Sequence, residues 1–217
     1  MTDPKKPKIS QRKQPQQARS TESVAVILEA ATQVLAKEGA HRFTTARVAE
    51  TAGVSVGTLY QYFPNKAAIL FRLQSDEWRE TTDLWRSILE DGTKLPLDCL
   101  RTLVDAFIRS ECAEAAMRVA LNDAAPLYRK APEALQLRAS AKQTMQVFMQ
   151  KALPNESKAS REVAAELITG TLSAVGKRFS EVPRTKAEIK AYAGAMGDMF
   201  CAYLTSRSSG SGSLANI

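Results

Sequence analysis

The residues best suited to specific polar contacts lie in the segment SVGTLYQYFPNK, from Ser55 to Lys66. Serine, threonine and tyrosine hydroxyls hydrogen-bond phosphates, and a glutamine amide bonds either a phosphate or a base edge. Lys66 adds a positive charge where a following helix should begin, and free amides at a helix start also favour an anion. These residue types predict a surface that binds a phosphate-bearing polyanion.

Other chemistry finds little support in the chain. The single histidine, His41, has no Ser/His/Asp or metal-ligand cluster around it, so we expect a loop histidine near phosphate. Cys99, Cys112 and Cys201 lack the paired spacing of a zinc site or a disulfide framework. We interpret them as reduced packing thiols, with a redox switch as the alternative. We expect no enzyme, no metal site and no cofactor.

The elements that must position these residues form a helix-turn-helix. Thr44 caps a short helix through Ala52, Gly53 begins a turn, and a second helix runs from about 56 to 63. Leu59 and Phe63 lie four residues apart and should face the core. The residues expected opposite them are Val56, Gly57, Thr58, Tyr60, Gln61 and Tyr62. In this motif the second helix enters the major groove of DNA, and a glycine there lets the backbone come close to it.

The segment TTARVAETAGVSVGTLYQYFPNKAAIL, residues 44–70, resembles the TetR family of bacterial transcriptional repressors. The resemblance extends from about Ser20 to Leu73. It implies a homodimer that reads a palindromic operator in double-stranded DNA, with a larger helical domain that binds a small-molecule effector and dimerises. The family's DNA contacts then fall on Thr44, Thr45, Ser55, Val56, Gly57, Thr58, Tyr60, Gln61, Tyr62 and Lys66. Val56 departs from members with a polar or basic residue there, so it either touches a thymine methyl or contributes less specificity.

Simpler interpretations remain open at this stage. Tyr60 and Tyr62 can be ordinary surface aromatics, and Gly57 a packing glycine. Residues 1–66 carry ten Lys/Arg and five Asp/Glu, a net charge of +5, whereas the remaining 151 carry 20 and 18, a net charge of +2. This excess suits nucleic acid. The arm at 1–19 either enters a minor groove or attracts phosphates without specificity.

Apolar periodicity predicts an all-α protein, with no strand pattern and no membrane-spanning run. The first helix begins after Ser20 or Thr21 and ends before Gly39, and a long connector helix starts at Asn65. Further helices are expected at about 96–111, 113–125, 132–152, 158–179 and 185–205. The predicted domains are a disordered basic arm at 1–19, a DNA-binding domain at 20–66, an effector and dimerisation domain at 67–205 and a flexible tail at 206–217. A basic start without a signal peptide predicts a cytoplasmic protein.

The C-terminal two-thirds carry weaker signals. Small residues in the last two helices favour close helix approach, either in a dimer interface or at crossings within one subunit. They are Gly170, Ala174, Gly194 and Gly197. An apolar or amphipathic effector would meet large side chains, which are otherwise plain core. They are Trp78, Trp85, Phe107, Met117, Asn122, Tyr128, Met145 and Phe148. For Asn122 the alternative is that it caps or ends a helix.

The function that these expectations describe is a transcriptional repressor released from its operator by an effector. A regulator without a small-molecule effector, controlled by a partner protein or by thiol oxidation, is the alternative. A helical interaction protein that has lost DNA binding is a third class, and it would lack salt-dependent affinity for DNA.

Overall fold

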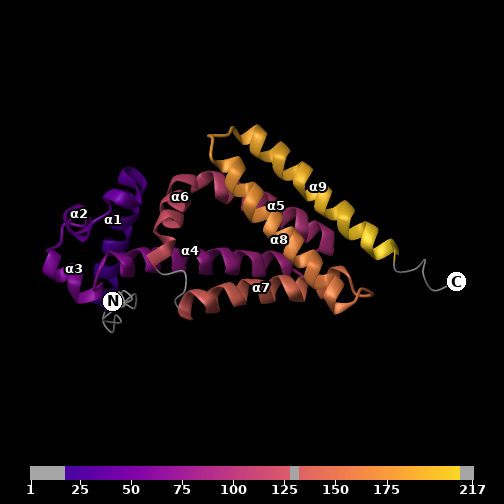
Figure 1. The fold of residues 1–217 in the computed structure, drawn as a ribbon, viewed down its shortest axis with the longest axis horizontal. Helices are drawn as coiled ribbons and strands as arrows, with labels where there is room; N and C mark the ends of the chain where they lie inside the picture. The colour runs from indigo at the N-terminus through magenta and orange to yellow at the C-terminus, as the bar shows by residue number, and fades with distance from the viewer. Residues whose placement is uncertain (1–17, 128–131, 211–217) are drawn as a thin grey trace, which may run out of the picture. The chain divides into compact units, whose positions relative to one another are not determined.

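The computed structural model describes residues 18–127 and 132–210, and these residues are helical apart from the connecting turns (Figure 1). The predicted all-α fold is confirmed. The arm predicted at 1–19 lies outside the described residues up to residue 17, as do Tyr128 and the tail from 211. The elements are α1 (Ala18–Arg42), α2 (Thr45–Thr51), α3 (Val56–Tyr62), α4 (Lys66–Leu89), α5 (Pro96–Ala113), α6 (Ala115–Ala124), the 3-10 turn η1 (Ala125–Leu127), α7 (Pro132–Ala152), α8 (Lys158–Ser180) and α9 (Lys186–Gly210).

The first and last helices differ most from the prediction. The first helix already includes Ala18, before the expected caps Ser20 and Thr21, because Ala18 and Arg19 are both good helix formers. The last helix continues through Gly210 rather than ending at 205, because residues 206–209 include neither proline nor glycine to stop it. Helix α1 is interrupted at Gly39, where the first helix was expected to end, and Gly53 lies in the turn after α2; their φ values of 73° and 65° fall in a region that favours glycine.

The chain divides into two compact units, and the first comprises 1–79 together with 116–137. Its core joins α1, α2, α3 and the start of α4, with fully buried Ile27, Phe43, Leu59 and Phe63. Helix α6 belongs to the same core through Leu121, which is 1% exposed, together with two alanines of that helix. The core that the helix-turn-helix shares therefore includes residues that lie far away in the sequence.

An ion pair also ties α6 to α4 within this unit. Arg118 Nη1 lies 2.9 Å from Glu77 Oε1, and both side chains are only 15% exposed. The other carboxylate oxygen accepts a hydrogen bond from Gln74 Nε2 at 2.8 Å, and Gln74 is itself buried. Both Glu77 oxygens thus have partners, which a largely buried carboxylate needs.

The second unit comprises 80–115 and 138–217, and its core gathers around α5. Helix α8 crosses α5 at Gly176, where an added Cβ would lie 2.8 Å from Phe107 Cε1. Phe107 in turn meets the Trp85 ring edge-on, with ring centroids 5.9 Å apart. Helix α9 crosses α5 at Gly197, beside Arg101, whose guanidinium pairs with Asp198. Small residues therefore set the contacts of α5 with both neighbours.

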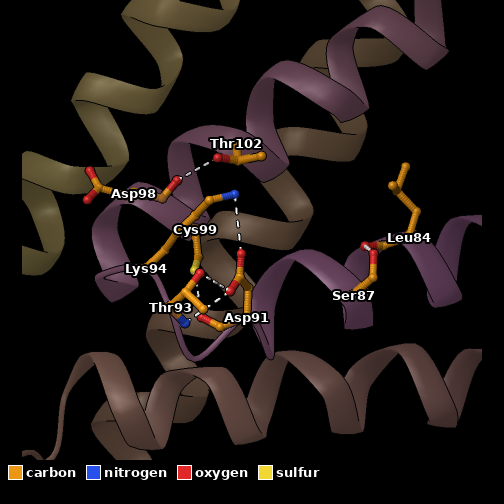
Figure 2. A network of polar contacts seen from close by, with 8 residues as sticks. All are labelled: Leu84, Ser87, Asp91, Thr93, Lys94, Asp98, Cys99 and Thr102. Atoms are coloured by element: carbon orange, nitrogen blue, oxygen red, sulfur yellow. Dashed lines mark hydrogen bonds and ion pairs between the residues drawn. The ribbon is translucent and has the colours of Figure 1, made fainter.

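A polar turn joins α4 to α5 (Figure 2). Asp91 Oδ1 accepts from the Thr93 hydroxyl at 2.5 Å and from the Thr93 amide at 3.0 Å, while Oδ2 pairs with Lys94 at 3.3 Å. These hydrogen bonds, the hydroxyl bond foremost, lower the pKa of the Asp91 carboxyl below its ordinary value. The Cys99 thiol donates to the Asp91 carbonyl at 3.7 Å, so the start of α5 is fastened to the same turn.

Candidate nucleic-acid interface

The start of α3 is fixed by the side chain of Ser55. Its hydroxyl accepts the Thr58 amide at 2.9 Å, which makes Ser55 the N-cap of the helix. The Ser55 and Thr58 hydroxyls also bond each other at 2.8 Å. The first turn of α3 therefore has a defined conformation before any ligand arrives.

A second hydrogen bond joins α2 to the middle of α3. Thr45 Oγ1 and the Tyr60 hydroxyl lie 3.1 Å apart on the surface, and Tyr60 is 40% exposed. The preceding residue, Thr44, is the N-cap of α2 and accepts the Arg47 amide at 3.3 Å. The start of α2 and the exposed face of α3 thus present adjacent hydroxyls, which suits contacts to a phosphate backbone.

Two basic residues near these hydroxyls differ in their surroundings, because one is paired with a carboxylate and the other is exposed at a helix start. Arg47 pairs with Glu38 of α1, and its guanidinium also donates to the Arg42 carbonyl at 3.3 Å. Lys66 is exposed at the first position of α4, where Asn65 caps the helix by accepting the Ala68 amide at 2.9 Å. Sequence analysis missed the capping role of Asn65, although an asparagine three residues before Ala68 signals it. Lys66 beside a capped helix start is the cation best placed to meet a phosphate.

The structure places most of the predicted contact residues on one exposed face. Val56, Gly57, Tyr60 and Gln61 are exposed and Thr58 is half-buried. The expectation that Tyr62 points away from the core is wrong, because its side chain is only 8% exposed. Tyr62 lies three residues after Leu59, and residues at that spacing share a helix face. It packs into the first core beside Phe63.

The predicted effector-binding residues are divided between the two cores. Trp78 and Met117 pack against the first, and Asn122 is exposed on α6. Those of the second core are Trp85, Phe107, Met145 and Phe148. Tyr128 lies outside the described residues. The prediction treated these positions as one set because nearly all are aromatic or sulfur-bearing, but side-chain type does not reveal which core a helix joins.

The small residues of α8 and α9 also divide into two groups. Gly197 is buried at the crossing with α5, 3.6 Å from Arg101 Cγ when a Cβ is added, so it serves packing within one protomer. Gly170, Ala174 and Gly194 are exposed. Sequence analysis missed two large neighbours of this face, Val163 and Leu167, which are 59% and 49% exposed. With Gly170 and Ala174 they follow the i, i+4, i+7, i+11 pattern of a helix stripe.

No helix among the described residues is long and apolar enough to cross a membrane.

The reactivity of the three cysteines is low, because burial raises the pKa of the Cys99, Cys112 and Cys201 thiols above the ordinary value. A thiol with a raised pKa holds less of the reactive thiolate at neutral pH.

Comparisons with known proteins find relatives of similar sequence and solved structures of similar fold. Probable HTH-type transcriptional regulator ArpR of Pseudomonas putida is 40% identical over 84 residues, which is 38% of this chain and 40% of that protein. The match thus spans less than half of the relative's length. A solved putative TetR-family regulator of Mesorhizobium loti is 19% identical, with a TM-score of 0.67 over 86% of this chain and 98% of that one. Regulator FadR of Bacillus subtilis, solved with stearoyl-CoA, is 16% identical, with a TM-score of 0.64 over 84% of this chain and 98% of that one.

Two family models together cover most of the chain. The one described as bacterial regulatory proteins, tetR family, matches residues 27–73, which contain the helix-turn-helix. The one described as tetracyclin repressor-like, C-terminal domain, matches 95–207, more than half of the 217 residues. With the exposed α3 and its capped first turn, these matches identify the chain as a DNA-binding transcriptional regulator that belongs to the TetR family.

Proposed function

We propose that this regulator is a homodimeric repressor that binds a palindromic operator and leaves it when a small apolar or amphipathic effector binds. The observation that carries the proposal is the exposed face of α3, held by the Ser55 cap and by the Thr45–Tyr60 hydrogen bond. A preformed face avoids the entropic cost of ordering side chains on binding. Tyr60 and Thr45 would bond phosphates, Lys66 would neutralise one, and Val56, Gly57 and Gln61 would approach the bases.

A dimer is supported by the exposed apolar stripes of α8 and α9. Val163, Leu167, Gly170 and Ala174 form one, and Met199, 52% exposed, lies with Ala195 and Ala202 on the other. Exposed apolar side chains gathered in one place mark interaction sites. Because two copies of one surface form a closed two-fold interface, each dimer would carry two α3 helices and read two half-sites.

An effector site in the second unit is supported by an unusual polar group. The Trp85 Nε1 atom is buried and has no hydrogen-bond partner among the described residues. A buried donor without an acceptor costs about 1–3 kcal/mol, which a ligand oxygen would recover. Phe107 and Phe148 of the same core would supply apolar walls. Because FadR of B. subtilis was solved in complex with stearoyl-CoA, acyl thioesters are the first compounds to test.

Control by thiol oxidation, the alternative, receives less support. Cys99 and Cys201 are buried, and burial is the largest cause of the raised pKa of each of the three thiols. A redox sensor needs the opposite, an accessible thiol of lowered pKa. A regulator controlled by a partner protein remains the competing proposal, and it predicts no compound that both stabilises the protein and releases DNA.

Selection of binding sites from random duplex DNA tests the proposal directly. We expect a palindromic consensus, with affinity that falls steeply as salt rises because bound phosphates release counterions. Lys66→Ala should lower the slope of log affinity against log salt by about 2 for the bound dimer, because each protomer loses one phosphate contact. Lys151→Ala is the matched control, an exposed lysine of α7 that should leave the slope unchanged.

Two further measurements separate the dimer from the effector. Leu167→Glu should give a monomer in sedimentation and weaken operator binding, whereas Val182→Glu, at a residue 54% exposed in a loop, should do neither. Addition of acyl-CoA thioesters should raise the melting temperature and release DNA together, since a ligand that binds only the folded protein stabilises it. A compound that stabilises the protein without affecting its DNA affinity would count against effector control by that compound.

A further inference from the structure

The exposed side chain at the start of α3 is apolar, and the polar side chains beside it are hydrogen-bonded to each other. The Ser55 hydroxyl is bonded to both the amide and the hydroxyl of Thr58, at 2.9 and 2.8 Å. Val56 follows Ser55 in the chain and is the first residue of the helix, and 41% of its surface is exposed. The leading position of this recognition helix therefore presents two methyl groups.

Folding gives no reason for a valine at this position. Val56 does not belong to the hydrophobic core of its unit, whose α3 members are Leu59 and Tyr62. Valine is also a poorer helix former than alanine, because its branched side chain loses rotamer freedom. The next residue, Gly57, has no side chain, and an added Cβ would meet only Ser55 Oγ, at 3.6 Å. Because Gly57 has no side chain, it does not hinder contact between Val56 and a ligand.

The edges of base pairs in the major groove offer one apolar group, the C5-methyl of thymine. A valine side chain has no hydrogen bond to give or accept, so contact with that methyl is the specific interaction open to it. We propose that Val56 reads the C5-methyl group of a thymine in each half-site of the operator. This inference rests on the proposed function, in which the N-terminal turn of α3 faces the bases.

Replacement of thymine by deoxyuridine removes only the methyl group and is the direct test. Each thymine of one half-site of the selected operator is replaced in turn, and affinity is measured for the full-length protein. We expect a loss of about fourfold at one thymine position, the value for one buried methyl-sized group. At cytosine in that position, 5-methylation should raise affinity by a similar factor.

Two variants assign the effect to the side chain. Val56→Ala should bind the thymine operator more weakly and should no longer distinguish thymine from deoxyuridine. Thr51→Ala, which also shortens a β-branched side chain but at an exposed position of α2 outside the predicted contact residues, is the matched control, and it should keep the full deoxyuridine effect. Circular dichroism of both variants checks that they are folded, which exposed positions lead us to expect.

The outcomes separate this inference from the proposed function. A parent protein that binds its palindrome with the expected salt dependence but tolerates deoxyuridine everywhere overturns the methyl contact and leaves the repressor proposal intact. An unchanged deoxyuridine effect in Val56→Ala also overturns it, since another residue then reads the methyl. If random DNA yields no preferred site, the proposed function fails and the methyl contact fails with it.

Discussion

Replacement of Arg118 by methionine tests the ion pair that ties α6 to α4. Methionine keeps much of the apolar stem but leaves Glu77 Oε1 without the guanidinium that lies 2.9 Å away. Because both side chains are only 15% exposed, water cannot fully replace the guanidinium as the partner of the Glu77 carboxylate. We therefore expect a loss of about 1–3 kcal/mol in the free energy of unfolding. The pair of Arg79 and Asp76 in the same unit, with side chains 53% and 31% exposed, is the control, and Arg79→Ala should cost less than about 0.5 kcal/mol.

The assay is urea unfolding followed by tryptophan fluorescence in a Trp85→Phe background. The remaining tryptophan, Trp78, packs against the first core and reports on the unit that contains the ion pair. A double-mutant cycle with Glu77→Met isolates the coupling, because the double variant no longer leaves one charge largely buried alone. The reasoning is refuted if Arg118→Met costs no more than Arg79→Ala, or if the coupling energy is within the error of zero.

Three further predictions concern the second unit. Gly176→Ala should lower stability by about 1–3 kcal/mol in urea unfolding, because its Cβ would lie 2.8 Å from Phe107, whereas Gly92→Ala, in the exposed turn after α4, meets nothing within 4 Å and should be neutral or stabilising. Asp91→Asn should lower the melting temperature above about pH 4. That difference should shrink as the pH falls through the lowered pKa of Asp91, because the parent then loses its carboxylate too; a difference that grows in acid contradicts the assignment. In alkylation of the native protein, followed by mass spectrometry, the half-buried Cys112 should react before the buried thiols, and equal rates at all three would show that the core opens readily.

Local signals were enough to predict the helix-turn-helix. Thr44 is the observed N-cap of α2, as predicted, and Gly53 has the positive φ expected of a turn glycine; the capping role of Ser55 at α3 was not predicted, although its signal is equally local. Each feature depends on a few consecutive residues, so the sequence determines it without knowledge of the rest of the fold. The same holds for α8, predicted at 158–179 and observed at Lys158–Ser180.

Features that depend on distant residues were predicted less well. Tyr62 was assigned to the outer face although its spacing from Leu59 places it inward, and Gly197 packs on Arg101 within one protomer. Nothing in the sequence of α6 indicates that Leu121 joins the core of the DNA-binding helices. Periodicity identifies an apolar face, but the element that covers it is decided by tertiary packing.

The place of α6 in the first core limits how the regulator can be re-engineered. A chimaera cut at residue 79 would transplant α1, α2 and α3 but leave behind Ala120, Leu121 and Ala124, which complete their core. Such a graft would leave the apolar surface that α6 covers either exposed to water or in contact with an unrelated helix. Exchange of operator specificity between relatives therefore requires the transfer of two separate stretches of chain, or else the replacement of only the outward residues of α3.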